Sequence, residues 1–131
     1  MTPILFINSS EVPFVDLILS GQKIYETRSR HVLRSAFERG TRILIAETGK
    51  GKPVVRCSAC IGSYRIIYTE DAWNRYRAFH AVPAGSAYDW KPDTKKKVLY
   101  ELCDVQPVPV PFTPPDSKRH GRVWMEYNGT L

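Results

Sequence analysis

The chain has 131 residues, of which 43% are hydrophobic, so it is long enough for one folded domain and too short for two. No apolar run approaches the roughly 18 residues of a membrane-spanning helix, and the first eight residues lack the features of a secretory signal. We therefore exclude a membrane-spanning helix and expect a cytoplasmic protein.

The net charge is +6, and the basic excess is concentrated between residues 21 and 65, where ten lysines and arginines stand against three glutamates. A contiguous basic excess is typical of a polyanion-binding surface. It is equally typical of a solvated face that keeps a protein soluble, so the charge alone leaves both interpretations open.

The first predicted elements are a strand at residues 4–7 and a short helix after it. Ser9 or Ser10 can cap this helix, and its first turn tolerates Pro13, whose missing N–H would be unpaired there anyway. Gly21 suits the left-handed position just past a helix end. A strand with alternating apolar and charged side chains then follows at residues 23–28.

The middle of the chain predicts a helical turn at residues 32–39 and then a hairpin. Residues 43–46 and 54–67 read as its strands, and the turn TGKGKP joins them. Residues 69–80 predict a helix, because Thr69 is a good cap and acidic residues follow it in the first turn.

The last part predicts a loop at residues 81–94, a strand at 97–105 and a final short strand at 123–127. Residues 106–115 hold five prolines, which suit an edge strand or an extended cover rather than a central strand. Several strands with two or three short helices, not in strict alternation, predict an α+β, mainly β fold built on a small, mostly antiparallel barrel.

Two of the three cysteines form a CxxC at Cys57 and Cys60, and the third thiol is Cys103. A zinc site needs about four converging ligands, and no second pair of ligands completes the set. Residues three apart in a strand also point to opposite faces. We therefore expect structural thiols, with no metal and no cofactor.

A motif of the form Gly-x-Lys-x-x-Glu-x-Arg stands in FVDLILSGQKIYETRSR, where it places Gly21, Lys23, Glu26 and Arg28. With the strand before it, this segment resembles the signature of the ASCH superfamily, and RGTRILIAE, KVLYELCDV and GRVW resemble later parts of the same domain. The resemblance implies one ASCH domain over residues 1–131 with a PUA-like barrel. It also implies a link to RNA metabolism and a cleft that Lys23, Glu26 and Arg28 line or support.

Elementary strand geometry supports part of this, because Glu26 and Arg28 are two apart, share a face and can form an ion pair. The pair could line a functional cleft, or it could simply close the barrel wall. The favoured interpretation is an RNA- or modified-nucleoside-binding domain whose arginines hold phosphates and whose aromatic residues stack on bases. The arginines are Arg28, Arg30, Arg42 and Arg56, and the aromatic candidates are Trp73, Tyr88 and Trp90.

The other interpretation is an enzyme in which Lys23, with a lowered pKa, acts on a small substrate. The resemblance supplies a concrete case, hydrolysis of acetylated cytidine by a Lys, a Thr three residues later and a Glu on a following strand. Here the position three residues later is Glu26, with Thr27 one further along on the other face. The position that corresponds to the later Glu lies near Ala59, which has no carboxyl group. Glu47, at the end of the preceding predicted strand, is the nearby carboxylate that could replace it.

A ribonuclease is a further alternative, with His31, His80 or His120 as the acid or base. Binding is favoured over either chemistry because the Thr and the later Glu are not where amide hydrolysis would need them. The oligomeric state is left open by the sequence.

Overall fold

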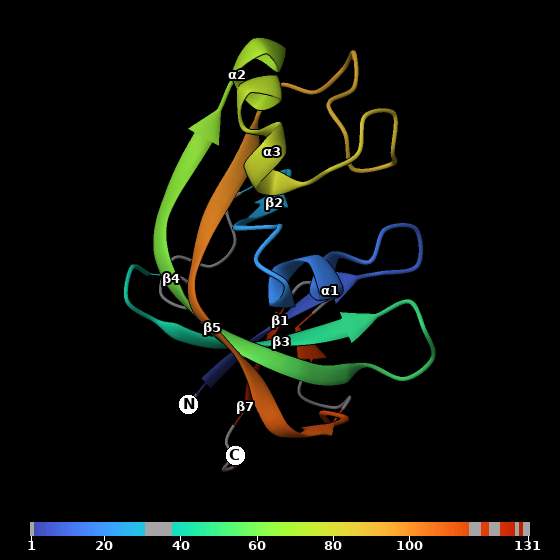
Figure 1. Cartoon of the computed structure of the whole chain (residues 1–131), viewed down its shortest axis with the longest axis vertical. Coiled ribbons are helices and arrows are strands. Elements are labelled where there is room, and N and C mark those ends of the chain that lie inside the picture. The colour runs from blue at the N-terminus through green and yellow to red at the C-terminus, as the bar shows by residue number, and fades with distance from the viewer. Residues whose placement is uncertain (1, 31–37, 116–118, 121–123, 128, 130–131) are drawn as a thin grey trace.

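The computed structural model describes residues 2–30, 38–115, 119–120, 124–127 and 129, and its main feature is one strongly curled sheet (Figure 1). The strands follow the order β2-β5-β4-β3-β1-β7-β6, and β1 and β3 are the parallel pair among otherwise antiparallel neighbours. The strands are β1 (Thr2–Asn8), β2 (Tyr25–Arg28), β3 (Arg42–Thr48), β4 (Val54–Ile67), β5 (Lys97–Phe112), β6 (Arg119–His120) and β7 (Trp124–Tyr127).

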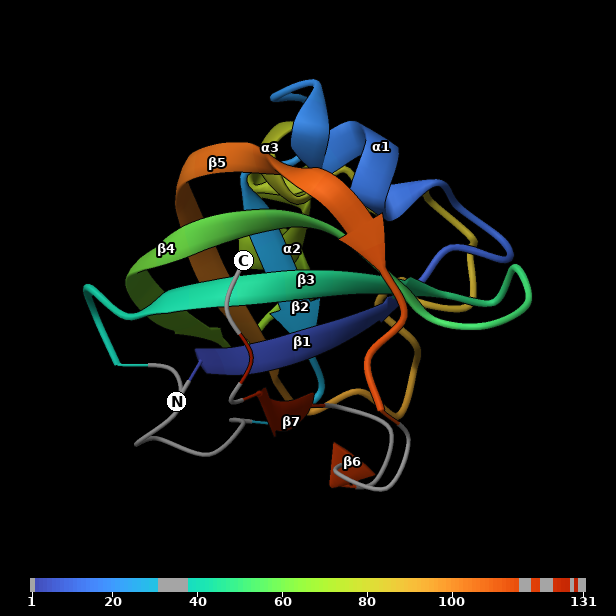
Figure 2. The ribbon, with the colours of Figure 1, turned by 90° about the horizontal axis from the view of Figure 1, so that it is seen from below.

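Among the described residues, three short helices accompany the sheet, namely α1 (Phe14–Leu19), α2 (Glu70–Arg75) and α3 (Arg77–His80). Figure 2 shows β5, β4, β3 and β1 following one another around the curve, with α1 at one side of the arch. The predicted α+β, mainly β fold with a PUA-like barrel is confirmed, with the sheet curled into a half-barrel.

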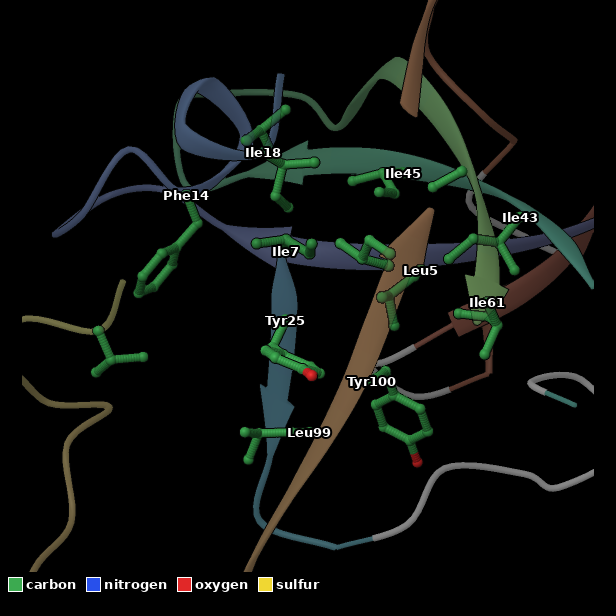
Figure 3. Packing of buried hydrophobic residues seen from close by; sticks show 14 of the residues in the cluster. Leu5, Ile7, Phe14, Ile18, Tyr25, Ile43, Ile45, Ile61, Leu99 and Tyr100 are labelled. Carbon is green, nitrogen blue, oxygen red and sulfur yellow. The ribbon is translucent and has the colours of Figure 1, made fainter. Parts of the chain in front are cut away.

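Alternating side chains give the sheet two separate cores. Leu5 and Ile7 of β1 join the main cluster, which includes Ile45 of β3 and Ile18 of α1 (Figure 3). The intervening side chains of β1, among them Phe6, join a smaller cluster with residues of β3, β4 and the second half of β5. Both faces of β1 are therefore buried, as the unbroken apolar run of this strand requires.

The predicted cap of the first helix is wrong. Pro13 occupies the N-cap position of α1, and no side chain of the described part of the chain caps the helix. Ser10 instead donates from its backbone N and its Oγ to Asn8 Oδ1, at 2.8 and 2.6 Å. The prediction for the other end is confirmed, because Gly21 has a φ of 82° and donates to Ile18 O at 3.1 Å.

The predicted hairpin is confirmed as β3 and β4, but the predicted helix at 69–80 is two helices. Thr69 caps α2 as expected, since its Oγ1 accepts from Ala72 N at 3.2 Å. Tyr76 then leaves helical geometry, with φ −92° and ψ 1°, and separates α2 from α3. The predicted helical turn at 32–39 falls mainly on residues 31–37, which lie outside the described residues.

Strand β5 is longer than predicted, because it continues through the proline-rich segment to Phe112. Its pairing with β2 spans Val98 to Glu101 only, so the later half is bonded on the β4 side and tolerates prolines. Within the described part of the chain, no helix has the length and apolar character needed to cross a membrane.

Candidate functional site

The Gly-x-Lys-x-x-Glu-x-Arg motif links the end of α1 to the edge strand β2. The backbone N of Lys23 donates to Leu17 O of α1 at 3.0 Å, and Ile24 N donates to Phe79 O of α3 at 2.8 Å. Leu102 of β5 donates its backbone N–H to Ile24 O at 2.9 Å. These bonds fix the chain between two helices and the sheet, so the Lys23 side chain enters the interior.

The Lys23 ammonium is completely buried and contacts a backbone carbonyl, a carboxylate and an aromatic ring. Its Nζ donates to His80 O at 2.6 Å, lies 3.8 Å from Glu26 Oε1 and sits 4.6 Å from the centre of the Phe14 ring. Burial lowers the pKa of Lys23 from 10.5 to about 8, with Arg28 acting in the same direction and Glu26 opposing it. A lysine in this state loses its proton far more readily than one in water.

The Glu26 carboxylate lies between two cations. Its Oε1 faces Lys23, and its Oε2 accepts a hydrogen bond from Arg28 Nη2 at 2.7 Å. The side chain is only 5% exposed, so this bond operates largely away from water. The predicted pairing of Glu26 with Arg28 on one face of a strand is confirmed.

Arg28 also connects two strands that do not pair with each other. Its Nη2 donates to Phe6 O at 2.7 Å, which joins the edge strand β2 to β1 across the open side of the half-barrel. Antiparallel pairing of β1 with β7 ends at Leu5, so the Phe6 carbonyl lies just past that ladder. The Nε of Arg28 is buried and has no acceptor among the described residues.

A cleft of about 520 Å³ opens beside this junction. Strand β2 contributes Glu26, Thr27 and Arg28 to its wall, while Lys23 stands behind Glu26 and is not part of the lining. The other lining residues come from the end of β1, the start of α1, the turn after β3 and the loop after α3; they are Phe6, Ile7, Asn8, Phe14, Thr48, Gly49, Gly51, Pro53 and Tyr88.

Tyr88 is held at the cleft by its neighbour Asp89. The Asp89 carboxylate accepts from Trp73 Nε1 at 2.7 Å, from Gly85 N at 2.8 Å and from Arg77 Nη2 at 3.0 Å. Burial alone would raise the pKa of Asp89, but these hydrogen bonds hold it well below the usual range. The Tyr88 ring then packs edge-on against Phe14, with the ring centres 5.3 Å apart.

The other aromatic candidates lie elsewhere. Trp73 is fully buried and its indole N–H is already bonded, so the expectation that it stacks on a base is wrong. Trp90 is half-buried against Trp73, with the ring centres 6.3 Å apart. Tyr88 alone of the three lines the cleft.

His80 serves the fold with both ring nitrogens. Nδ1 accepts from Val82 N at 2.9 Å, which leaves Nε2 to donate to Trp73 O at 3.0 Å, and the ring stacks on the Trp73 indole. Burial lowers the pKa of His80 to about 4, so it stays neutral at physiological pH. This bonding contradicts its suggested role as an acid or base. His31 lies outside the described residues, and His120 is in β6.

Several other predicted site residues form ion pairs outside the cleft. Arg42 pairs with Asp104, and Arg56 bridges Asp16 and Glu47 at 2.8 and 3.0 Å. Arg30 is exposed beyond the end of β2, and Ala59 is a buried core residue opposite Ile43. The structure therefore brings together Lys23, Glu26, Thr27 and Arg28 and leaves Arg42, Arg56 and Glu47 in separate contacts.

Two features of the site were not predicted. The turn TGKGKP, which the sequence identifies only as a hairpin turn, lines the cleft with Gly49 and Gly51 and carries exposed Lys50 and Lys52 beside them. A second hollow of about 310 Å³ follows the end of β2 and is lined by Ser29, Asp93, Thr94, Lys95, Lys96 and Lys97. The run of three lysines was the available signal, but its place beside β2 depends on the fold.

No group of three or more potential metal-ligating side chains occurs among residues 2–30, 38–115 and the short described segments after them. The two cysteines of the CxxC do not point toward a common site. Cys57 faces the main core, while Cys60 is partly exposed on the opposite face of β4.

The curled sheet, the helix-to-strand motif and the cleft beside it define the class of fold to which the chain belongs, that of the ASCH domains. A crystal structure of an ASCH protein from Zymomonas mobilis aligns with a TM-score of 0.66 and 24% identity, over 81% of this chain and 69% of its own. Two mutant ASCH proteins from the same organism align with TM-scores of 0.69 and 0.68 and identities of 24% and 25%. Each covers 86% of this chain, and the alignments span 75% and 73% of the mutant chains.

No family model matches the sequence, and no curated protein matches it either. The ASCH resemblance in the sequence is nevertheless confirmed by the fold.

Substitution of Glu26 tests whether its carboxylate holds the neighbouring cations in place. Glu26→Gln leaves the buried Lys23 and the partly buried Arg28 without a compensating charge, so we expect the free energy of unfolding to fall by about 3 to 5 kcal/mol. Asp104→Asn removes the same charge from the exposed Arg42 pair and should cost at most about 1 kcal/mol. Denaturant unfolding of both variants decides the matter, and equal reductions in stability would contradict a central role for Glu26.

The lowered pKa of Lys23 predicts a pH dependence. The unfolded chain binds more protons than the folded one between about pH 8 and 10.5, so this group makes the protein more stable as pH rises through that window. Lys23→Met removes the titration while keeping most of the side-chain volume. The stability difference between wild type and variant should change by up to about 1.4 kcal/mol per pH unit there. Lys50→Met, at an exposed position, should leave the pH dependence of stability unchanged. If the stability difference between wild type and Lys23→Met stays constant across this pH window, the pKa of Lys23 is not lowered in the folded protein.

Proposed function

We propose that the cleft between β1 and β2 binds a nucleoside, either free or as an unpaired nucleotide of RNA. The observation that carries this proposal is the Glu26 carboxylate, which is buried and fixed by Arg28 yet forms part of the cleft wall. The cleft volume of about 520 Å³ falls in the range of small-ligand sites, typically about 300 to 1,000 Å³.

The polar groups of the wall suit the edge of a nucleobase. A fixed carboxylate accepts hydrogen bonds from an exocyclic amine or a ring N–H, and the partly exposed guanidinium of Arg28 lies next to it in the cleft wall. Tyr88 supplies an aromatic surface in the cleft lining, where a base could stack. Recognition of an unstacked base by one carboxylate, one guanidinium and one aromatic ring is typical of single-stranded RNA binding.

Basic side chains at the rim favour a ligand that carries phosphates. Lys50 and Lys52 project from the turn that lines one end of the cleft. Beyond Arg28, the hollow at the end of β2 carries the exposed Lys95 and Lys96, whereas the Lys97 ammonium donates to Tyr88 O at 3.1 Å. The exposed lysines at these two places would supply the phosphate contacts that determine affinity for an RNA strand with one base in the cleft.

Tyr88→Ala should weaken binding of a short single-stranded RNA by about 1 to 3 kcal/mol, because it removes the stacking surface. Tyr68→Ala is the matched control, since Tyr68 is 65% exposed and is not part of the cleft lining. Affinities come from fluorescence anisotropy with labelled oligonucleotides. If both variants bind as the wild type does, the cleft is not the binding site.

Salt dependence separates phosphate contacts from base contacts in the same experiment. The double variant Lys50→Ala, Lys52→Ala should reduce the slope of log affinity against log salt by about 0.7 for each phosphate that these lysines neutralise in the wild type. Tyr88→Ala should weaken binding without changing that slope.

A second candidate function is hydrolysis of the amide of an acylated nucleoside such as acetylated cytidine. Its support is the lowered pKa of the buried Lys23, because an amine that loses its proton near pH 8 can act as a base or nucleophile. Lys23 lies behind Glu26, so a proton would pass through that carboxylate, and Thr27 offers a hydroxyl at the same wall. Binding ranks first because the ammonium is bonded to His80 O and does not border the cleft.

Incubation of the protein with acetylated cytidine, followed by measurement of released acetate, distinguishes the two candidates. For a binding domain, we expect no release by the wild type and none by Lys23→Met. Release by the wild type that falls by orders of magnitude in Lys23→Met, with unchanged nucleoside affinity, would instead establish the hydrolase, because a proton carrier acts chiefly in the transition state.

A further inference from the structure

Cys60 and Cys103 lie directly opposite each other in the sheet, although they are 43 positions apart in the sequence. Cys60 is in β4, Cys103 is in β5, and their Cα atoms are partners in the antiparallel register. The next residues in register, Ile61 and Leu102, both point into the main core. The two thiols therefore share the outer face of the sheet.

The Cys103 thiol lies over Gly62, which is two residues after Cys60 and has no side chain. A Cβ placed at Gly62 would meet the Glu101 carboxylate and would lie 2.7 Å from Cys103 Sγ. The absence of a side chain at Gly62 therefore leaves space for the Cys103 sulfur and the Glu101 carboxylate, beside the Cys60 position. Both thiols are partly exposed, whereas Cys57 is fully buried in the core on the other face.

The spacing of an antiparallel pair matches the requirement of a disulfide. Directly opposed residues have Cα atoms roughly 4.5 or 5.5 Å apart, and disulfides span Cα separations of roughly 4.4 to 6.8 Å. The strand register thus places the two cysteines within the range of backbone separations that a disulfide spans. The adjoining backbone is fixed on one side by Arg42, which bonds to both the carbonyl and the carboxylate of Asp104, a residue with a φ of 47°.

We propose that Cys60 and Cys103 are a modification site, at which a low-molecular-weight disulfide such as oxidised glutathione converts them to a reversible cross-strand disulfide. The thiolate of one cysteine attacks a sulfur of oxidised glutathione, and one glutathione thiolate leaves and takes up a proton. The second cysteine, as its thiolate, then attacks the mixed disulfide and releases the other glutathione. The two cysteines lose two electrons and two protons in total, and one oxidised glutathione becomes two reduced molecules.

The environment of Cys103 affects the rate of this thiol–disulfide exchange. Burial and the nearby Glu101 carboxylate raise the pKa of Cys103, with Arg39 opposing them, so little of this thiol is ionised at neutral pH. The bond would close the segment from 60 to 103, which contains α2, α3 and the loop that places Tyr88 in the cleft. Because the unfolded chain would lose the freedom of that loop, the oxidised form should be the more stable one.

The test treats the reduced, folded protein with mixtures of reduced and oxidised glutathione and follows the products by intact mass and peptide mapping. We expect two of the three thiols to disappear, a mass lower by two hydrogens and a peptide linking Cys60 to Cys103. The midpoint of guanidinium unfolding should rise on oxidation and return after reduction. Cys57→Ser is the matched control and should form the same bond.

Cys60→Ser and Cys103→Ser should each abolish the intramolecular bond and leave a glutathione adduct on the remaining partner. The proposal is overturned if the wild type accumulates only mixed disulfides, if Cys57 takes part in the bond, or if the folded protein leaves all three thiols unmodified. A lower unfolding midpoint after oxidation would also overturn it, because that result means the native spacing does not accommodate the bond.

Discussion

The arrangement of this protein depends on one buried carboxylate. Glu26 is nearly inaccessible to water, and it compensates the charges of Lys23 on one side and Arg28 on the other. Arg28 in turn reaches Phe6 O and joins the edge strand β2 to β1. Burying a charge without a partner costs several kcal/mol, so each member of this chain of contacts needs the others. The same contacts that close the open side of the half-barrel also form one wall of the cleft.

This dual use explains why the motif suits both a structural and a functional interpretation. An ion pair that only closes a wall would be shielded from ligands, whereas Glu26 and Arg28 border a cleft. Lys23 differs from both, because its ammonium is bonded to a backbone carbonyl behind the wall. Its lowered pKa therefore follows from burial that the fold imposes, and burial of this kind also prepares lysines for chemistry.

The part of the cleft lined by Tyr88 depends on the segment between β4 and β5. Trp73, Arg77 and Asp89 form a hydrogen-bonded group that fixes the loop after α3 and brings Tyr88 to the cleft. His80 joins α2 to that loop through both ring nitrogens. Trp73 and His80, which look available for chemistry in the sequence, thus help to position one tyrosine. Cys60 and Cys103 lie in β4 and β5, the two strands that flank this segment.

The sequence by itself determined the local features. Alternation in residues 23–28 placed Glu26 and Arg28 on one face, Gly21 ended a helix, and the TGKGKP turn joined two strands, because each of these depends on residues close together in the chain. Only the tertiary structure decided which distant groups meet. The contact of Arg28 with Phe6 and the position of Lys23 behind the cleft wall depend on the strand order, and the pairing of Cys60 with Cys103 depends on the register shifts between β4 and β5. A shift of one residue in that register reverses every side chain, and no local pattern specifies it.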